Sequence, residues 1–174
     1  QTNADYQSLR AFSKHNYLYF RSASSFVYTF DTKWKINNYL RAQLASCNLL
    51  PSEEFGLGGL STVRGYKERI VNGDDAFVWN FELCTPPVSI YHNLGGKKNI
   101  NDALTVLGFF DYGIVSVKKT VEGQDKSTFL MSSGPALRYD ISTNVMCRLD
   151  WGLQLKTLDL NEPSQRLSFS LSMG

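Results

Sequence analysis

Apolar and polar residues alternate along most of this chain, and this period of two constrains the fold more than any other feature. From Asn144 to Lys156 the odd positions carry the apolar side chains Val145, Cys147, Leu149, Trp151, Leu153 and Leu155. The polar side chains of the same segment, Asn144, Arg148, Asp150, Gln154 and Lys156, occupy even positions. A period of two places the two sets on opposite faces of a strand, whereas a helix mixes them around its circumference.

The same alternation recurs along the chain and predicts about eight strands and no helix. The expected strands are Tyr6–Lys14, Tyr17–Phe30, Trp34–Leu44, Ala76–Leu83, Leu104–Val117, Thr128–Asp140, Asn144–Lys156 and Arg166–Met173. The predicted fold class is therefore all-β with antiparallel strands.

Strand and link lengths indicate the environment. Several segments run for about 10 to 14 residues, longer than strands of soluble proteins and suited to tilted membrane strands. Long links at Asn48–Asp74, Pro86–Asp102 and Lys119–Lys126 contrast with short ones at 140–143 and 161–164, as in outer-membrane barrels with loops on one side and turns on the other. Outward aromatic residues would be Trp34, Trp79, Tyr112 and Trp151. A soluble sandwich or barrel also alternates, but these two cues favour a transmembrane barrel.

Composition excludes several other classes. No stretch approaches the roughly 18 to 20 apolar residues of a membrane helix, and a net charge of +2 gives no argument for a nucleic-acid partner.

The three cysteines, Cys47, Cys84 and Cys147, lack paired spacing, so we expect them to fill apolar space rather than to bind zinc. A single disulfide between two of them stays open. The start, Gln1–Asp5, lacks signal-peptide features, so we expect a chain cut from a longer precursor or a processed start.

Residues for catalysis are sparse. The histidines are His15 and His92, and no GxSxG, HExxH or P-loop pattern occurs. The doublets Glu53–Glu54 and Asp74–Asp75 are expected to be solvated loop charges. We therefore expect no enzyme, no catalytic residue, no cofactor and no metal site.

One segment is far more specific than its surroundings. Residues 52–68 read SEEFGLGGLSTVRGYKE and are followed by Gly73–Asp74. The ordered pattern E-x-F-x-L-G-G, V-R-G-Y, acidic residue and Gly-Asp resembles the loop of the two-partner secretion (TpsB-type) transporters, within the superfamily of POTRA-bearing outer-membrane barrels. Downstream, Asn80–Leu83 and Leu107–Gly113 resemble the family's next strands, with inward-facing Glu82 and Asp111.

The resemblance also defines what is missing. It implies that residues 1–174 are the carboxy-terminal part of a transmembrane barrel, about eight of a probable sixteen strands, with a loop at about 48–74 folded into the lumen. POTRA domains, the plug helix and the first half of the barrel would lie outside this chain. Half a barrel leaves two unpaired edges, which lipid does not tolerate, so we expect the amino-terminal half of the same barrel as a partner. The terminal Met173–Gly174 departs from the family in lacking a closing aromatic residue.

Resemblance and physical chemistry agree on the loop motif. Val63, Arg64, Gly65 and Tyr66 would form the gating tip, positioned by Phe55, Gly58 and Gly59. A charge in a confined lumen requires a partner, and Asp111, with Glu82 as a second acceptor, is the expected partner of Arg64. A strut that only stabilises the barrel is the alternative role of this loop.

The implied function is outer-membrane translocation of a partner protein, which passes unfolded through the pore. Two alternatives are assembly or organelle import of membrane proteins by a member of the same superfamily, and a barrel anchor of a fused surface enzyme. We expect an integral outer-membrane protein of a Gram-negative-type envelope, with an organelle outer membrane as the second option. Its surroundings would be the lipid bilayer and lipopolysaccharide, the latter near Lys97–Lys98.

Overall fold

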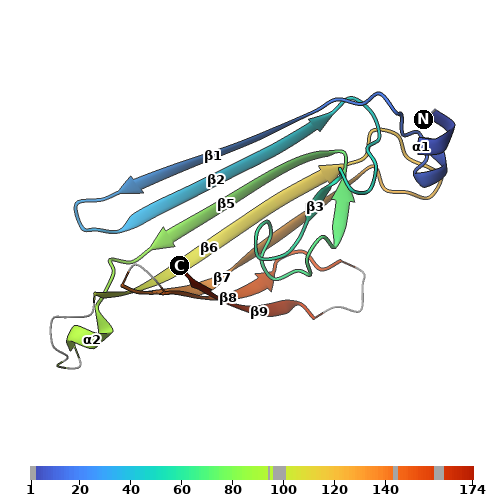
Figure 1. The fold of residues 1–174 in the computed structure, drawn as a ribbon. Helices are drawn as coiled ribbons and strands as arrows, with labels where there is room; N and C mark the ends of the chain where they lie inside the picture. The colour runs from blue at the N-terminus through green and yellow to red at the C-terminus, as the bar shows by residue number, and fades with distance from the viewer. Residues whose placement is uncertain (1–2, 94, 96–100, 143–144, 159–162) are drawn as a thin grey trace.

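A single antiparallel sheet dominates the computed structural model, which describes residues 3–93, 95, 101–142, 145–158 and 163–174 (Figure 1). The sheet order is β1-β2-β5-β6-β7-β8-β9, so neighbours in the sheet are neighbours along the main strands of the chain. The seven strands are β1 (Tyr19–Thr29), β2 (Lys35–Ala45), β5 (Asp75–Cys84), β6 (Asp102–Ser116), β7 (Ser127–Ile141), β8 (Val145–Gln154) and β9 (Gln165–Met173). The all-β antiparallel prediction is confirmed.

The expected strand at Tyr6–Lys14 is wrong. This part of the chain begins with a helix, α1 (Asn3–Leu9), whose last turn continues through a hydrogen bond from Arg10 N to Tyr6 O. Its apolar residues Tyr6 and Leu9 are three apart, which is helical spacing, and Asp5 in the first turn suits the helix dipole. The sheet thus has seven strands rather than about eight, and α2 (Ile90–Asn93) is a second helix that the alternation did not predict.

Register gives the sheet two unlike faces. Asn80 pairs with Asp111 and Asp111 with Ser132, so these polar side chains share one face, which we call the inner face. The other face exposes large apolar side chains on every strand, including Phe26, Phe77, Trp151 and Phe169. Tyr112, expected to point outward, pairs with outward-facing Trp79. An exposed apolar face opposite a polar one is the arrangement of a membrane barrel wall.

The segment between β2 and β5 folds back onto the inner face, with the two-stranded β3 (Phe55–Leu57) and β4 (Val71–Gly73) at its base (Figure 1). Its side chains supply three of the seven buried residues of the main apolar core. The buried residues of this cluster are Leu57, Val63 and Tyr66 from the loop, and Ala76, Val78, Val115 and Leu130 from the sheet. The core therefore lies between loop and sheet, and its burial holds the loop in place.

The expected separation of long and short links is only partly right. Antiparallel strands reverse end at each connection, so the β5–β6 link lies at the same end as the β1–β2 turn. In Figure 1, α2 in this link lies at the end opposite to α1. The β5–β6 link, expected to be long, thus joins strand ends on the same side as the short β1–β2 turn. The β8–β9 link, expected to be short, joins strand ends on the side of the long β2–β5 loop. That part of the loop-asymmetry argument fails.

Both sheet edges are open within the described residues, since β1 pairs only with β2 and β9 only with β8. Neither described helix is long and apolar enough to cross a membrane. The Lys97–Lys98 pair lies outside the described residues, so the expected contact with lipopolysaccharide stays a prediction.

Candidate functional site: the loop tip on the inner face

Two glycines form the turn that leads into the loop tip. Gly58 and Gly59 have φ angles of 105° and 99°, a region that glycine adopts without steric cost. The hydroxyl of Thr62 locks the turn, accepting from Gly58 N at 2.9 Å and donating to Gly58 O at 2.8 Å. A side chain on Gly59 would overlap the carboxylate of Glu68. Phe55, the third expected positioning residue, packs against the apolar core from β3.

Arg64 makes the densest set of contacts in the loop. Its Nε and Nη2 donate to the two oxygens of Asp111 at 2.7 and 2.8 Å, and its backbone N donates to the same carboxylate at 3.0 Å. Asp111 is fully buried and Arg64 is 4% exposed. This is the two-point geometry in which an arginine fork binds a carboxylate most strongly, and it matches the contact expected from the sequence.

Further acceptors complete the surroundings of Arg64. Its Nη1 donates to Glu82 on β5 at 2.7 Å and to Asp150 on β8 at 3.1 Å. The guanidinium carbon lies 3.7 Å from the ring centre of Phe109 on β6, close enough for a cation–π contact. Burial by itself lowers the pKa of the Arg64 guanidinium, but the hydrogen bonds and charges of Asp111 and Glu82 outweigh it and raise the pKa. The group stays charged.

The neighbours of Arg64 form a network across five strands. Arg138 on β7 donates to Asp150 at 2.7 Å and lies 3.6 Å from Glu82. Asn80 on β5 donates to Asp111 at 2.7 Å and accepts from Arg41 on β2 at 2.9 Å. The loop tip is thus bound through polar contacts to β2, β5, β6, β7 and β8 together.

The rest of the motif fits closely against the wall. Gly65 has φ 91°, and a Cβ on it would lie 3.0 Å from the backbone of Gly152 on β8. Val63 is fully buried beside Gly113. Tyr66 is buried and its hydroxyl donates to the carbonyl oxygens of Met131, at 2.8 Å, and Lys156. Burial raises the pKa of the Tyr66 hydroxyl, so it remains a donor at neutral pH.

A second polar cluster fixes the base of the loop. The fully buried Asp74 accepts from Arg10 at 2.5 Å, from the backbone N of Leu49 at 2.7 Å and from that of Lys118 at 2.8 Å. Arg10 also pairs with Glu54 at 2.8 Å. The first and last residues of the loop are thereby joined to the amino-terminal segment and to the β6–β7 link.

Sequence reasoning placed Arg64, Asp111 and Glu82 together but missed Asp150 and Phe109, which also contact Arg64. Asp150 lies on the polar parity of β8 and Phe109 on the parity of Asp111, so alternation already assigned both to the inner face. Nothing in the sequence said that they stand beneath Arg64, because that depends on how far the sheet curls. At the base of the loop, Asp74 is fully buried, so the expectation of a solvated charge is wrong there.

The arrangement is suited to holding a loop in one position rather than to covalent chemistry. Arg64 from the loop forms ion pairs with the carboxylates of Glu82, Asp111 and Asp150 on the strands. Such side-chain ion pairs can separate and re-form without any change in the strands that carry them. The loop motif's part in gating stays a prediction at this point.

Comparison with known proteins identifies the relationship. The family model of the haemolysin secretion/activation proteins ShlB/FhaC/HecB matches residues 2–139, most of the chain. Searches of characterised proteins and of solved structures gave no match. Members of the matched family are outer-membrane secretion transporters rather than enzymes, and the strand-rich fold agrees with that description. The chain belongs to the ShlB/FhaC/HecB family of haemolysin secretion/activation proteins.

Proposed function

We propose that residues 1–174 form part of the wall and the gate of an outer-membrane pore through which one partner protein is secreted. The seven strands would be the carboxy-terminal portion of a larger barrel, completed by strands outside this chain. Open edges at β1 and β9 within the described residues support this, because unpaired backbone is not tolerated in lipid. The apolar outer face would contact the bilayer.

The observation that carries the proposal is the seating of the loop on the inner face by Arg64. In a closed barrel that face lines the lumen, so a loop lying there obstructs the path of a passing chain. The tip is held by ion pairs and by a modest apolar core, which together are strong enough to close the pore and weak enough to release. We therefore assign the loop to gating, and the 63–66 motif to its closed position.

The family match favours secretion over the assembly, import and enzyme-anchor alternatives, because its description is secretion and activation of haemolysins. The partner would be a protein of that type, passing unfolded and driven by its own folding outside. The amino-terminal half of the barrel and periplasmic partner-binding domains would come from outside residues 1–174.

Deleting the gene from the source organism tests this function. We expect one secreted protein to disappear from the culture medium and to return when the complete wild-type protein is supplied. An Arg64→Ala version should restore less of it. An unchanged set of secreted proteins, with outer-membrane proteins lost instead, would contradict secretion and favour assembly.

A further inference from the structure

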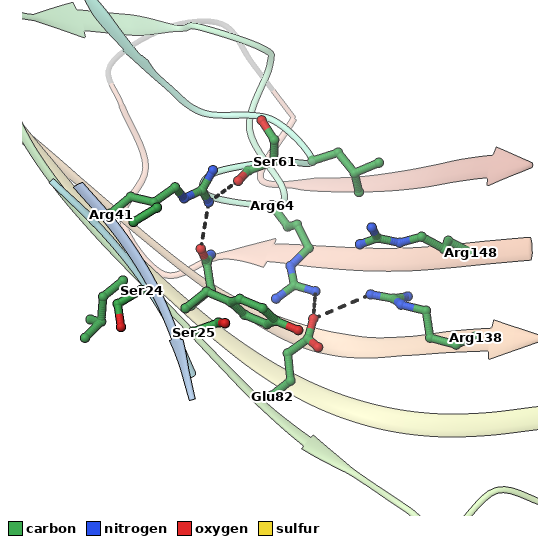
Figure 2. A pocket seen from close by; sticks show the side chains of 13 residues that line it. Ser24, Ser25, Arg41, Ser61, Arg64, Glu82, Arg138 and Arg148 are labelled. Atoms are coloured by element: carbon green, nitrogen blue, oxygen red, sulfur yellow. Dashed lines mark hydrogen bonds and ion pairs between the residues drawn. The ribbon is translucent and has the colours of Figure 1, made fainter. Parts of the chain in front are cut away.

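A pocket of about 490 Å³ lies on the inner face between the first strands and the loop tip. Figure 2 shows its labelled side chains converging from β1, β2, β5, β7, β8 and the loop. The volume is in the range of sites that bind small molecules or short segments of chain. Arginine dominates the charged lining, through Arg41, Arg64, Arg138 and Arg148, against the single acid Glu82.

The carboxylates in reach are already used. Glu82 accepts from Arg64 and faces Arg138, as the dashed lines in Figure 2 mark. The two buried acids behind the pocket, Asp111 and Asp150, accept from Arg64 and Arg138. Counting these acids, four arginines face three carboxylates, so the network carries excess positive charge.

That excess resides on Arg41 and Arg148. Arg41 donates to the carbonyl oxygen of Ser61 and to Asn80, and among the residues that the structure describes it has no carboxylate in ion-pair contact. Arg148 reaches Asp150 only at 3.9 Å. Two partly exposed guanidinium groups thus line one pocket without a close counter-charge, so an added carboxylate would find a cation free to pair with it.

Arg148 also has an unsatisfied donor. Its Nε is buried and has no hydrogen-bond partner among the described residues. Nε itself is covered, but the side chain as a whole is 34% exposed and lines the pocket, so part of the guanidinium can be approached from there. A guanidinium with free donors and an open approach is the group that binds a carboxylate at two points.

We propose that this arginine pocket binds an acidic side chain of an extended polypeptide, with Arg148 and Arg41 as the two cationic groups. The inference rests on the proposed function, under which the inner face is the path of the secreted partner and the carboxylate belongs to that partner. The pocket adjoins the loop tip, since Ser61 and Arg64 line it, so an incoming acid would also attract Arg64 and Arg138, the two arginines that Glu82 binds. Binding would weaken the closed loop contact.

Binding of a fluorescently labelled hexaglutamate peptide to the complete protein in detergent tests the site. We expect binding that hexaglutamine does not show, weakened about fivefold by Arg148→Gln and by Arg41→Gln, as for a partly solvated charged contact. Arg166→Gln removes the same charge from an exposed position on β9 and should leave binding unchanged. Heat-modified gel mobility checks that each variant is folded.

A charge reversal keeps the test independent of folding losses. Arg148→Glu should reject hexaglutamate and bind hexalysine, a change that a purely structural role does not produce. Equal binding of hexaglutamate and hexaglutamine, or equal losses in Arg148→Gln and Arg166→Gln, would overturn the proposal. Conductance of the same preparation in planar bilayers is recorded in parallel. Conductance without glutamate preference refutes the site alone, and absence of conductance refutes the pore as well.

Discussion

The tip and the base of the long loop are both fixed by buried charges, but in opposite ways. At the tip, one arginine from the loop meets carboxylates that belong to three different strands, Glu82, Asp111 and Asp150. At the base, one carboxylate from the loop, Asp74, receives two backbone N–H groups and Arg10. Arg64 also donates its backbone N–H to Asp111, but most polar contacts of the tip are side-chain ion pairs, which can separate, whereas the backbone donors at the base are fixed by the fold. The comparison suggests a permanent base and a releasable tip.

The largest effect is expected from reversing a charge at the tip. Asp111→Arg places two cations together and leaves Arg64 without its main acceptor, and breaking a buried pair costs about 3 to 5 kcal/mol. We expect the loop to leave the wall without taking up a defined open position, so that it is cleaved rapidly near residue 64. An unseated loop obstructs the lumen, and we expect at least tenfold less secreted partner. Asp140→Arg is the matched control, because Asp140 lies on the same inner face of the sheet, on β7, but outside the cluster around Arg64.

The reciprocal exchange sharpens this test. Arg64→Asp combined with Asp111→Arg restores opposite charges, and we expect partial recovery of protease resistance. Full recovery is not expected, because Glu82 and Asp150 still favour a cation on the loop. If Asp111→Arg leaves both loop position and secretion intact, the assignment of Asp111 as the partner of Arg64 is wrong.

Removal of the negative charge of Asp74 at the base should lower the stability of the protein rather than change gating. Asp74→Asn turns one acceptor into a donor facing buried donors, a loss of about 2 kcal/mol. We expect a lower midpoint of heat-modified gel mobility, with the tip still protected from protease. Asp75→Asn, whose carboxylate is partly exposed and paired with Lys118, should lower the midpoint less. Equal midpoints for the two variants would show that the base does not depend on buried Asp74.

Gly65 provides a test of how closely the backbone of the loop tip approaches β8. Gly65→Ala introduces strain of about 1 to 2 kcal/mol from its positive φ, and adds a Cβ against the backbone of Gly152. Gly123→Ala has a similar φ of 80° but no atom within 4 Å of the new Cβ. We therefore expect reduced loop protection for Gly65→Ala alone. Matching losses in both variants would mean that backbone strain, not contact with β8, determines the effect.

The smallest effect is expected from Tyr66→Phe. The ring remains in the apolar core and only the hydroxyl bonds to Met131 and Lys156 are lost, worth about 1 kcal/mol. Loop protection should fall slightly and secretion should stay near wild type, by quantitative blotting of the medium. A defect as large as that of Asp111→Arg would mean that the hydroxyl, not the ion pair, holds the tip.

The fold was largely predictable because alternation is a local property. Seven strands follow from it, since an apolar outer face and a polar inner face require a strict period of two. The strand predicted at 6–14 was wrong because the few apolar residues of this segment do not fix a period, and the contact of Arg10 with Asp74, just after α1, cannot be read from the sequence. The prediction of which end of the sheet carries the long links was wrong, because that end depends on whether the number of preceding strands is odd or even.

The site was predictable in pairs but not as a network. The order of residues in the loop motif pointed to Arg64. The alternation along the strands placed the side chains of Asp111 and Glu82 on the inner face. Asp150 and Arg138 belong to strands far along the chain, and they meet Arg64 only because the sheet curls around the loop. A buried Asp74 could not be told from a solvated one, since both occur in a polar, turn-rich sequence.

The central claim is that the loop tip must leave the wall for secretion to occur. A disulfide between Val63→Cys and Gly113→Cys tests it most directly, because a Cβ on Gly113 would lie 2.9 Å from Val63 Cγ2. The same Cβ would lie 2.3 Å from Leu57 Cδ1, so Leu57 must shift, and the Gly113→Cys single variant measures the effect of that shift. The complete protein would first have Cys47, Cys84 and Cys147 replaced, and the single-cysteine variants carry the same packing change as controls. We predict that the oxidised pair blocks secretion and that reduction restores it. Undiminished secretion with the disulfide formed would show that the loop is a static strut and contradict the account.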